Sequence, residues 1–99
     1  MVIYLDSQNR VITDEIVSSG TVNKTAVFPR ELVRQALTHQ ASAVIIVHNH
    51  PNHTTRASQA DIDMTKRLHD ALRLVDISLH DHLIVAGSAC VSFKTQGLL

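Results

Sequence analysis

The sequence has one cysteine, no net charge and no long hydrophobic run, and each of these limits what the protein can be. A single cysteine, Cys90, excludes an internal disulfide and every metal site built from several cysteines. Any bound metal must therefore be held by histidines and carboxylates. Nine Lys and Arg residues against nine Asp and Glu residues give no overall positive charge for nucleic acid or an anionic membrane. We therefore expect no nucleic-acid binding by this domain alone.

The apolar segments are too short to cross a bilayer, and the first residues lack the basic region and cleavage site of a signal peptide. The expected location is the cytoplasm, without membrane association. A chain of 99 residues that is 44% hydrophobic is expected to form one small domain, residues 1–99, around a single core.

Strand-like and helix-like segments follow one another along the chain, which predicts an α/β fold. The expected strands are residues 2–5, 10–17, 21–27, 77–86 and 90–93 and the central 43–47. The expected helices run from 29 to about 38–40 and from about 58 to about 74. Residues 43–47 show no polar alternation, which is typical of a strand covered on both faces. This predicts helices on both sides of the sheet.

Two histidines and an aspartate flank the junction between the central strand and the second helix. His48 and His50 end the strand two residues apart, so their side chains leave an extended backbone on the same side. Ser58 and Asp61 open the following helix as Ser-x-x-Asp. Asp61 heads the apolar stripe of that helix, an unusual place for a carboxylate without a partner. Two His and one Asp with one coordination position left for water are the ligands of a catalytic zinc site.

A zinc hydrolase needs two further groups. Zn²⁺ lowers the pKa of a bound water from ~15.7 to ~7, so hydroxide becomes available at neutral pH. A general base must then carry the proton to the leaving amine, and a donor must stabilise the oxyanion. Glu15, which lies mid-strand between apolar neighbours, and Ser58 are the candidates.

Each of these residues also has a simpler explanation. Ser58 and Asp61 could form an ordinary helix cap, the two histidines could lie on the surface, and Glu15 could be solvated. The same ligand types also suit non-haem iron. A second pair, His80 and His82, has no carboxylate at a helix start, which predicts hydrogen-bonded strand histidines.

Three other residues are expected to have no part in the chemistry. Cys90 lacks any local sign of activation and is expected to be buried. His39 and His69 lie on helices near charged residues and are expected at the surface.

The pattern His48-x-His50-Pro51 followed by Ser58-x-x-Asp61 resembles the JAMM motif of the JAB/MPN metalloproteases. The wider context resembles the RadC branch over essentially the whole chain, and the segments that carry this are Gly20-Thr-Val-Asn23, Pro29-Arg-Glu31, Ala43-Val-Ile-Ile-Val-His-Asn-His-Pro51, Asp81-His-Leu-Ile84 and Gly97-Leu-Leu99. The resemblance implies a mixed, curved sheet flanked by helices, similar to the deaminase-like arrangement.

In that family two histidines and an aspartate bind zinc, which assigns the metal to His48, His50 and Asp61. A serine helps to stabilise the transition state and a glutamate from an earlier strand acts as the base, which assigns these tasks to Ser58 and Glu15. The implied substrate is a peptide or protein that is cut at a peptide or isopeptide bond.

The sequence departs from the RadC pattern in two places. His53 replaces a glycine of the loop that follows the proline, and we expect it to be exposed and to shape substrate entry. The alternative is that His53 is a fourth ligand that closes the site and silences catalysis. RadC-like proteins usually carry an N-terminal region resembling helix-hairpin-helix DNA-binding modules, whereas this chain begins directly at the first strand. RadC-like proteins also carry a historical link to DNA repair, whose molecular basis this sequence does not support. The alternative function is a non-catalytic accessory domain associated with DNA repair.

Overall fold

The computed structural model describes residues 1–16, 29–50 and 55–99, and these form strands and helices in the order expected. The elements are β1 (Val2–Leu5), β2 (Val11–Glu15), α1 (Pro29–Thr38), β3 (Ala43–Asn49), α2 (Gln59–Arg73), β4 (Ser78–Ala86) and β5 (Ala89–Ser92). The expected strand at residues 21–27 and the loop residue His53 lie outside the described residues.

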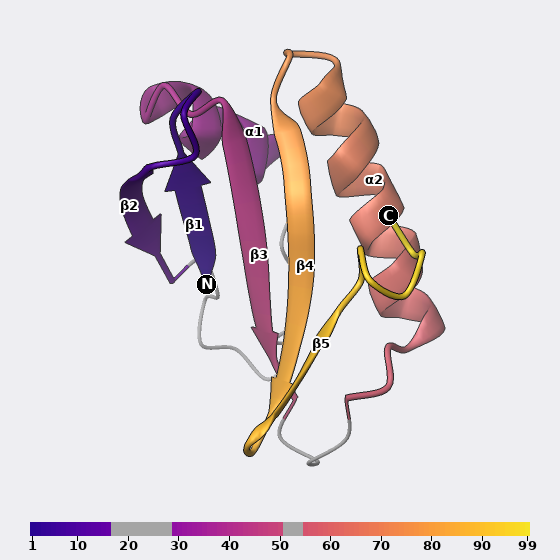
Figure 1. Cartoon of the computed structure of the whole chain (residues 1–99). Helices are drawn as coiled ribbons and strands as arrows, with labels where there is room; N and C mark the ends of the chain where they lie inside the picture. The colour runs from indigo at the N-terminus through magenta and orange to yellow at the C-terminus, as the bar shows by residue number, and fades with distance from the viewer. Residues whose placement is uncertain (17–28, 51–54) are drawn as a thin grey trace.

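The five strands form one mixed sheet in the order β2-β1-β3-β4-β5 (Figure 1). Only β3 and β4 run parallel, and α2 connects them; the other neighbours are antiparallel. A parallel pair requires a crossover connection, and a helix is its usual form. The α/β class and the mixed sheet flanked by helices, both predicted from the sequence, are therefore confirmed.

The main core lies on one face of this sheet. Tyr4 is opposite Val44, which is in turn opposite Leu79, so the three side chains share a face. Both helices add side chains to the same hydrophobic cluster, and the two helices contact each other. The buried residues that they contribute are Leu32 and Ala36 from α1 and Leu68 and Leu72 from α2.

The prediction of helices on both sides of the sheet is therefore wrong for the described part of the chain. Ile45 and Val47, which point to the opposite face of β3, are only half-buried. An apolar run without polar alternation cannot distinguish a strand that is fully covered from one whose second face is left partly open. In Figure 1, α1 lies behind the sheet and α2 runs beside β4.

Helix α2 has the bounds that its apolar pattern predicts. Ser58 is its N-cap and Leu74 its C-cap, and Asp76 then adopts a left-handed conformation with φ of 59° that turns the chain into β4. The backbone N–H of Ile77 donates to the carbonyl of Leu72 and closes this turn. None of the helices in the described ranges is long and apolar enough to cross a membrane.

Candidate metal centre

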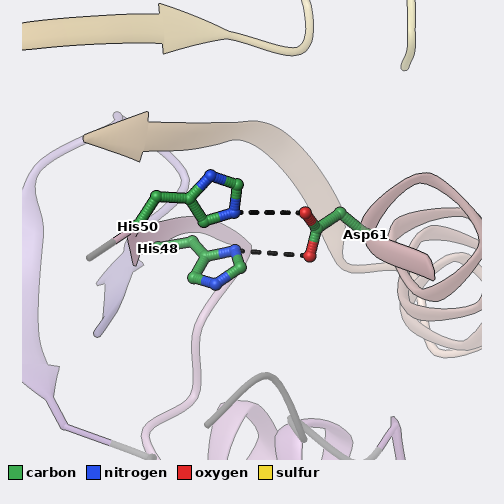
Figure 2. Close-up of side chains that lie close together, drawn as sticks. All are labelled: His48, His50 and Asp61. Carbon is green, nitrogen blue, oxygen red and sulfur yellow. Dashed lines mark hydrogen bonds and ion pairs between the residues drawn. The ribbon is translucent and has the colours of Figure 1, made fainter. Parts of the chain in front are cut away.

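The structure brings His48, His50 and Asp61 together between the end of β3 and the first turn of α2 (Figure 2). Nδ1 of His48 lies 3.5 Å from Oδ1 of Asp61. Nε2 of His50 lies 3.2 Å from Oδ2 of the same carboxylate. The three potential ligand atoms all lie within 4.8 Å of one another. These are the three residues to which the sequence assigns the metal.

The two histidines are fixed by the pairing of β3 with β4. His48 is opposite Ile84, and the backbone N–H of His50 donates to the carbonyl of Val85. Side chains two residues apart on a strand leave on the same side, and the imidazole rings accordingly meet edge to face with centroids 4.5 Å apart. The sheet therefore places both rings before any ligand is present.

The aspartate is fixed by the N-terminal cap of α2. Oγ of Ser58 accepts a hydrogen bond from the backbone N–H of Asp61, and the N–H of Ser58 donates to Oδ2 of Asp61, both at 3.0 Å. This is a complete capping box, so the simpler explanation of the Ser-x-x-Asp pattern is confirmed. The same contacts also hold the carboxylate beside the histidines, so the cap and the metal group are compatible.

Burial and neighbouring groups set the charges at this site. Asp61 is only 5% exposed, and burial alone would raise its pKa, but hydrogen bonds from Ser58 and the nearby His48 and His50 hold the pKa below its usual value. Burial lowers the pKa of His48, and the Asp61 carboxylate only partly opposes this effect. An ionised carboxylate and a neutral imidazole are the protonation states that bind metals.

Each of the three residues offers one ligand atom, and these atoms all lie within 4.8 Å of one another. The contacts at 3.5 and 3.2 Å reach the two different oxygens of Asp61, so they are ion-pair contacts of the metal-free chain. Two imidazoles and one carboxylate are common metal ligands, so the donor set fits a metal site.

Glu15 lies outside this group. Its Oε1 is 3.3 Å from Nε2 of His39, and the His39 ring packs against Tyr4 with centroids 4.6 Å apart. Burial raises the pKa of Tyr4, and the nearby Glu15 carboxylate adds to the shift. The assignment of Glu15 as the base is not tested by this contact and stays a prediction.

One of the simpler expectations is wrong, and another holds only in part. The His39 side chain is 25% exposed, but its Nε2 is buried because the residue follows α1 and its ring packs on Tyr4. Cys90, expected to be buried, is exposed on β5, which is an edge strand of the sheet.

A buried histidine, His82, lies beside the metal group, and the sequence did not predict this position for it. His82 is 5% exposed, its ring stacks on Phe93 at 4.3 Å, and its Nδ1 lies 2.7 Å from the hydroxyl of Thr65. Burial, followed by the nearby His48, lowers its pKa to about 4. The prediction of hydrogen-bonded strand histidines is confirmed for His82 and for His80, which bonds to Asn9. His82 alternates with the buried Ile84 and Ala86 along β4, and this period of two was the available signal.

Comparison with known proteins identifies similar sequences along the full chain. The family model for the RadC-like JAB domain matches residues 1–98. A UPF0758 protein of Pseudoalteromonas translucida, PSHAa2643, is 54% identical over 99 residues, which is 100% of this chain and 44% of that protein. The UPF0758 protein YkfG of Escherichia coli strain K12 is 52% identical over 98 residues, 99% of this chain and 62% of that protein. The chain thus spans 44% to 62% of the length of these relatives.

Proposed function

The chain belongs to the RadC-like JAB domain family, and we propose that it is a zinc-dependent hydrolase that cuts an amide bond in a peptide or protein. The observation that carries the proposal is the convergence of two imidazoles and one buried carboxylate, whose ligand atoms lie within 4.8 Å of one another. Non-haem iron would accept the same ligand types, so the identity of the ion belongs to the proposal.

His48, His50 and Asp61 would hold the ion. A zinc ion bound there would supply a water of lowered pKa and would polarise the substrate carbonyl. The buried Asp61 is tied to Ser58 and both imidazoles are fixed by β3, so the ligands need little rearrangement to bind. Such preorganisation keeps the cost of ordering the ligands low.

Ser58 is proposed as the oxyanion donor. Its Oγ already accepts the N–H of Asp61, and because a hydroxyl can accept and donate at once, its own proton stays available. The residue is exposed at the helix start, next to the carboxylate of the metal group. A substrate carbonyl oxygen placed there could receive this proton in a hydrogen bond as negative charge develops.

Glu15 is proposed as the general base that takes a proton from the attacking water and passes it to the leaving amine. The sheet register supports this assignment. Val2 lies opposite Glu15 on one side and Ile46 on the other, so the three side chains share a face. His48 follows Ile46 by two residues and points to the same face. In the proposed reaction the Glu15 carboxylate takes up the proton on the face of the sheet that also carries His48.

The first test is the metal content of the purified chain, measured by elemental analysis after reconstitution with zinc. We expect about one zinc per chain, because the three ligand atoms surround one position. His48→Ala and Asp61→Asn should lose the metal, and His80→Ala is the matched control because His80 bonds to Asn9 instead. A wild-type chain that takes up no zinc, or variants that keep it, would remove the basis of the proposal.

The second test is hydrolysis. A library of peptides and isopeptide-linked peptides is incubated with the zinc-loaded chain, and cleavage is followed by mass spectrometry. Cleavage that is lost with a chelator and restored by zinc supports a metallopeptidase. A loaded chain that cleaves nothing but binds branched DNA, with an affinity that falls steeply with salt, would favour the non-catalytic accessory function instead.

A further inference from the structure

His82 and Thr65 form a buried polar link between β4 and α2, directly behind the metal group. Thr65 is fully buried on α2, and His82 is 5% exposed on β4. Buried polar side chains in a small core cost free energy unless their hydrogen bonds are satisfied, so such a pair needs an explanation. Among the described residues, the other buried side chains are hydrophobic except for Asp61.

The hydroxyl of Thr65 makes two short contacts that determine the direction of the hydrogen bonds. Oγ1 lies 2.7 Å from the backbone carbonyl of Asp61 and 2.7 Å from Nδ1 of His82. A carbonyl can only accept, so the single hydroxyl proton is donated to the carbonyl of Asp61, and Oγ1 accepts a hydrogen bond from Nδ1–H of His82. This direction places a proton on Nδ1 of His82.

The link reaches each side of the metal group. Through Thr65 it holds the carbonyl of Asp61, whose N–H and carboxylate are already held by Ser58. Through its ring, His82 stacks on His48 with centroids 5.8 Å apart and an angle of 29°. Phe93 supports the same imidazole, at 4.3 Å and 20°. One side chain thus contacts the element that carries the aspartate and the ring of one histidine.

We propose that His82 and Thr65 are positioning residues for the metal group: the pair sets the orientation of Asp61 and of the His48 ring without supplying a ligand. Nε2 of His82 is buried and finds no hydrogen-bond partner among the described residues, and the group that could hold a metal does not include it. The inference rests on the proposed metal site. Outer hydrogen bonds of this kind are known to orient ligands and to strengthen metal binding.

The test measures zinc affinity by competition with a chromophoric chelator, together with the thermal unfolding midpoint of the metal-free chain. Thr65→Val removes the hydroxyl at nearly constant shape, and Thr65→Ser keeps it. We expect Thr65→Val and His82→Leu to weaken zinc binding by about 10- to 100-fold, and Thr65→Ser to bind close to the wild-type affinity. Leu72→Ala is the control, because this buried α2 residue contacts the core and should lower the midpoint without weakening zinc binding.

A second readout does not depend on metal at all. The ¹⁵N chemical shifts of the His82 imidazole in the metal-free chain should show the proton on Nδ1 in the wild type and in Thr65→Ser. Thr65→Val should shift it towards Nε2, because the acceptor for Nδ1–H is gone. This measurement tests the direction of the hydrogen bond between His82 and Thr65 even where a variant binds zinc too weakly to titrate.

Three results would overturn the inference. Wild-type zinc affinity in Thr65→Val would show that the link does not position the ligands. An equal loss of affinity in Leu72→Ala would show a general effect of core damage, and an Nε2 proton on His82 in the wild type would contradict the hydrogen-bond direction. A wild-type chain that binds no zinc would instead contradict the proposed function, so the two failures are distinct.

Discussion

Glu15 and His39 are joined between the last residue of β2 and the residue that follows α1, with Oε1 of the glutamate 3.3 Å from Nε2 of the histidine. Their side chains are about one-third and one-quarter exposed, at 32% and 25%. The contact gives the proposed general base a defined partner in the metal-free chain. Substitutions of Glu15 and of His39 can therefore separate the contribution of Glu15 to catalysis from its contribution to structure.

The first prediction concerns Glu15→Gln. The residue is not in the group that could hold the metal, so the variant should keep about one zinc per chain. Its turnover should fall by about 10²- to 10⁴-fold, because an amide cannot take up the proton. Metal content and the cleavage rate of a peptide found in the library screen are the measurements. His39→Gln is the control: it removes the imidazole, keeps the carboxylate and should retain turnover. Normal turnover in Glu15→Gln would contradict the assigned base.

The second prediction separates the two tasks of Ser58. Ser58→Ala removes the cap and should lower the free energy of unfolding by about 1 kcal/mol, whereas Ser58→Asp restores a good N-cap and should stay near the wild type. Neither side chain can donate a hydroxyl proton at the position of Oγ, so both should lower turnover by about 10²- to 10³-fold. Urea unfolding and cleavage rates test this. Wild-type turnover in Ser58→Asp would show that the serine is only a cap.

The third prediction is a pH dependence of stability that arises at His82. Its pKa falls from 6.5 in the unfolded chain to about 4 in the folded one, chiefly because of burial. On acidification the unfolded chain takes up the proton first, so stability is lost as the pH falls from 6.5 to 4 and is retained above 6.5. The loss from this residue alone is about 3 kcal/mol.

This dependence is measured by urea unfolding of the metal-free chain between pH 7 and pH 4. His82→Leu should show a shallower decline than the wild type, because its side chain does not titrate. Equal slopes in the two proteins would contradict the low pKa of the folded state.

The fourth prediction contrasts two leucines at the end of α2. Leu72 is fully buried and Leu74 is 86% exposed. Leu72→Ala should lower the free energy of unfolding by about 2–5 kcal/mol, because it opens a cavity where the two helices meet the sheet. Leu74→Ala should change it by less than about 0.5 kcal/mol. Comparable losses of stability in both variants would contradict the burial of Leu72 and the exposure of Leu74.

The order of the elements and the meeting of the three side chains that could hold a metal could be predicted because both depend on local patterns. A β-branched run ending in two histidines sets where β3 stops, and Ser58 with an apolar stripe sets where α2 begins. The strand end and the helix start are only 11 residues apart in sequence at His50 and Asp61, so short-range geometry brings them together. The family resemblance was in turn borne out by a match over residues 1–98.

The features that escaped prediction depend on tertiary register. Thr65 and His82 are 17 residues apart and meet only because α2 packs on β4 at one particular offset. The packing of His39 on Tyr4 depends in the same way on how α1 lies across β1. No periodicity within a single element carries this information, and the uninterrupted apolar run of β3 likewise does not reveal which face the helices cover.

The short separation between the three ligand residues also bears on how the chain folds. All of them lie within residues 48–61, from the end of β3 to the first turn of α2. Closing so small a loop costs little entropy and is fast, whereas the pairing of β4 with β3 must wait for the whole of α2. A metal ion present during refolding could therefore bind the β3–α2 junction early and act as a nucleus. Zinc should then speed folding as well as slow unfolding, in contrast to a ligand that recognises only the finished sheet.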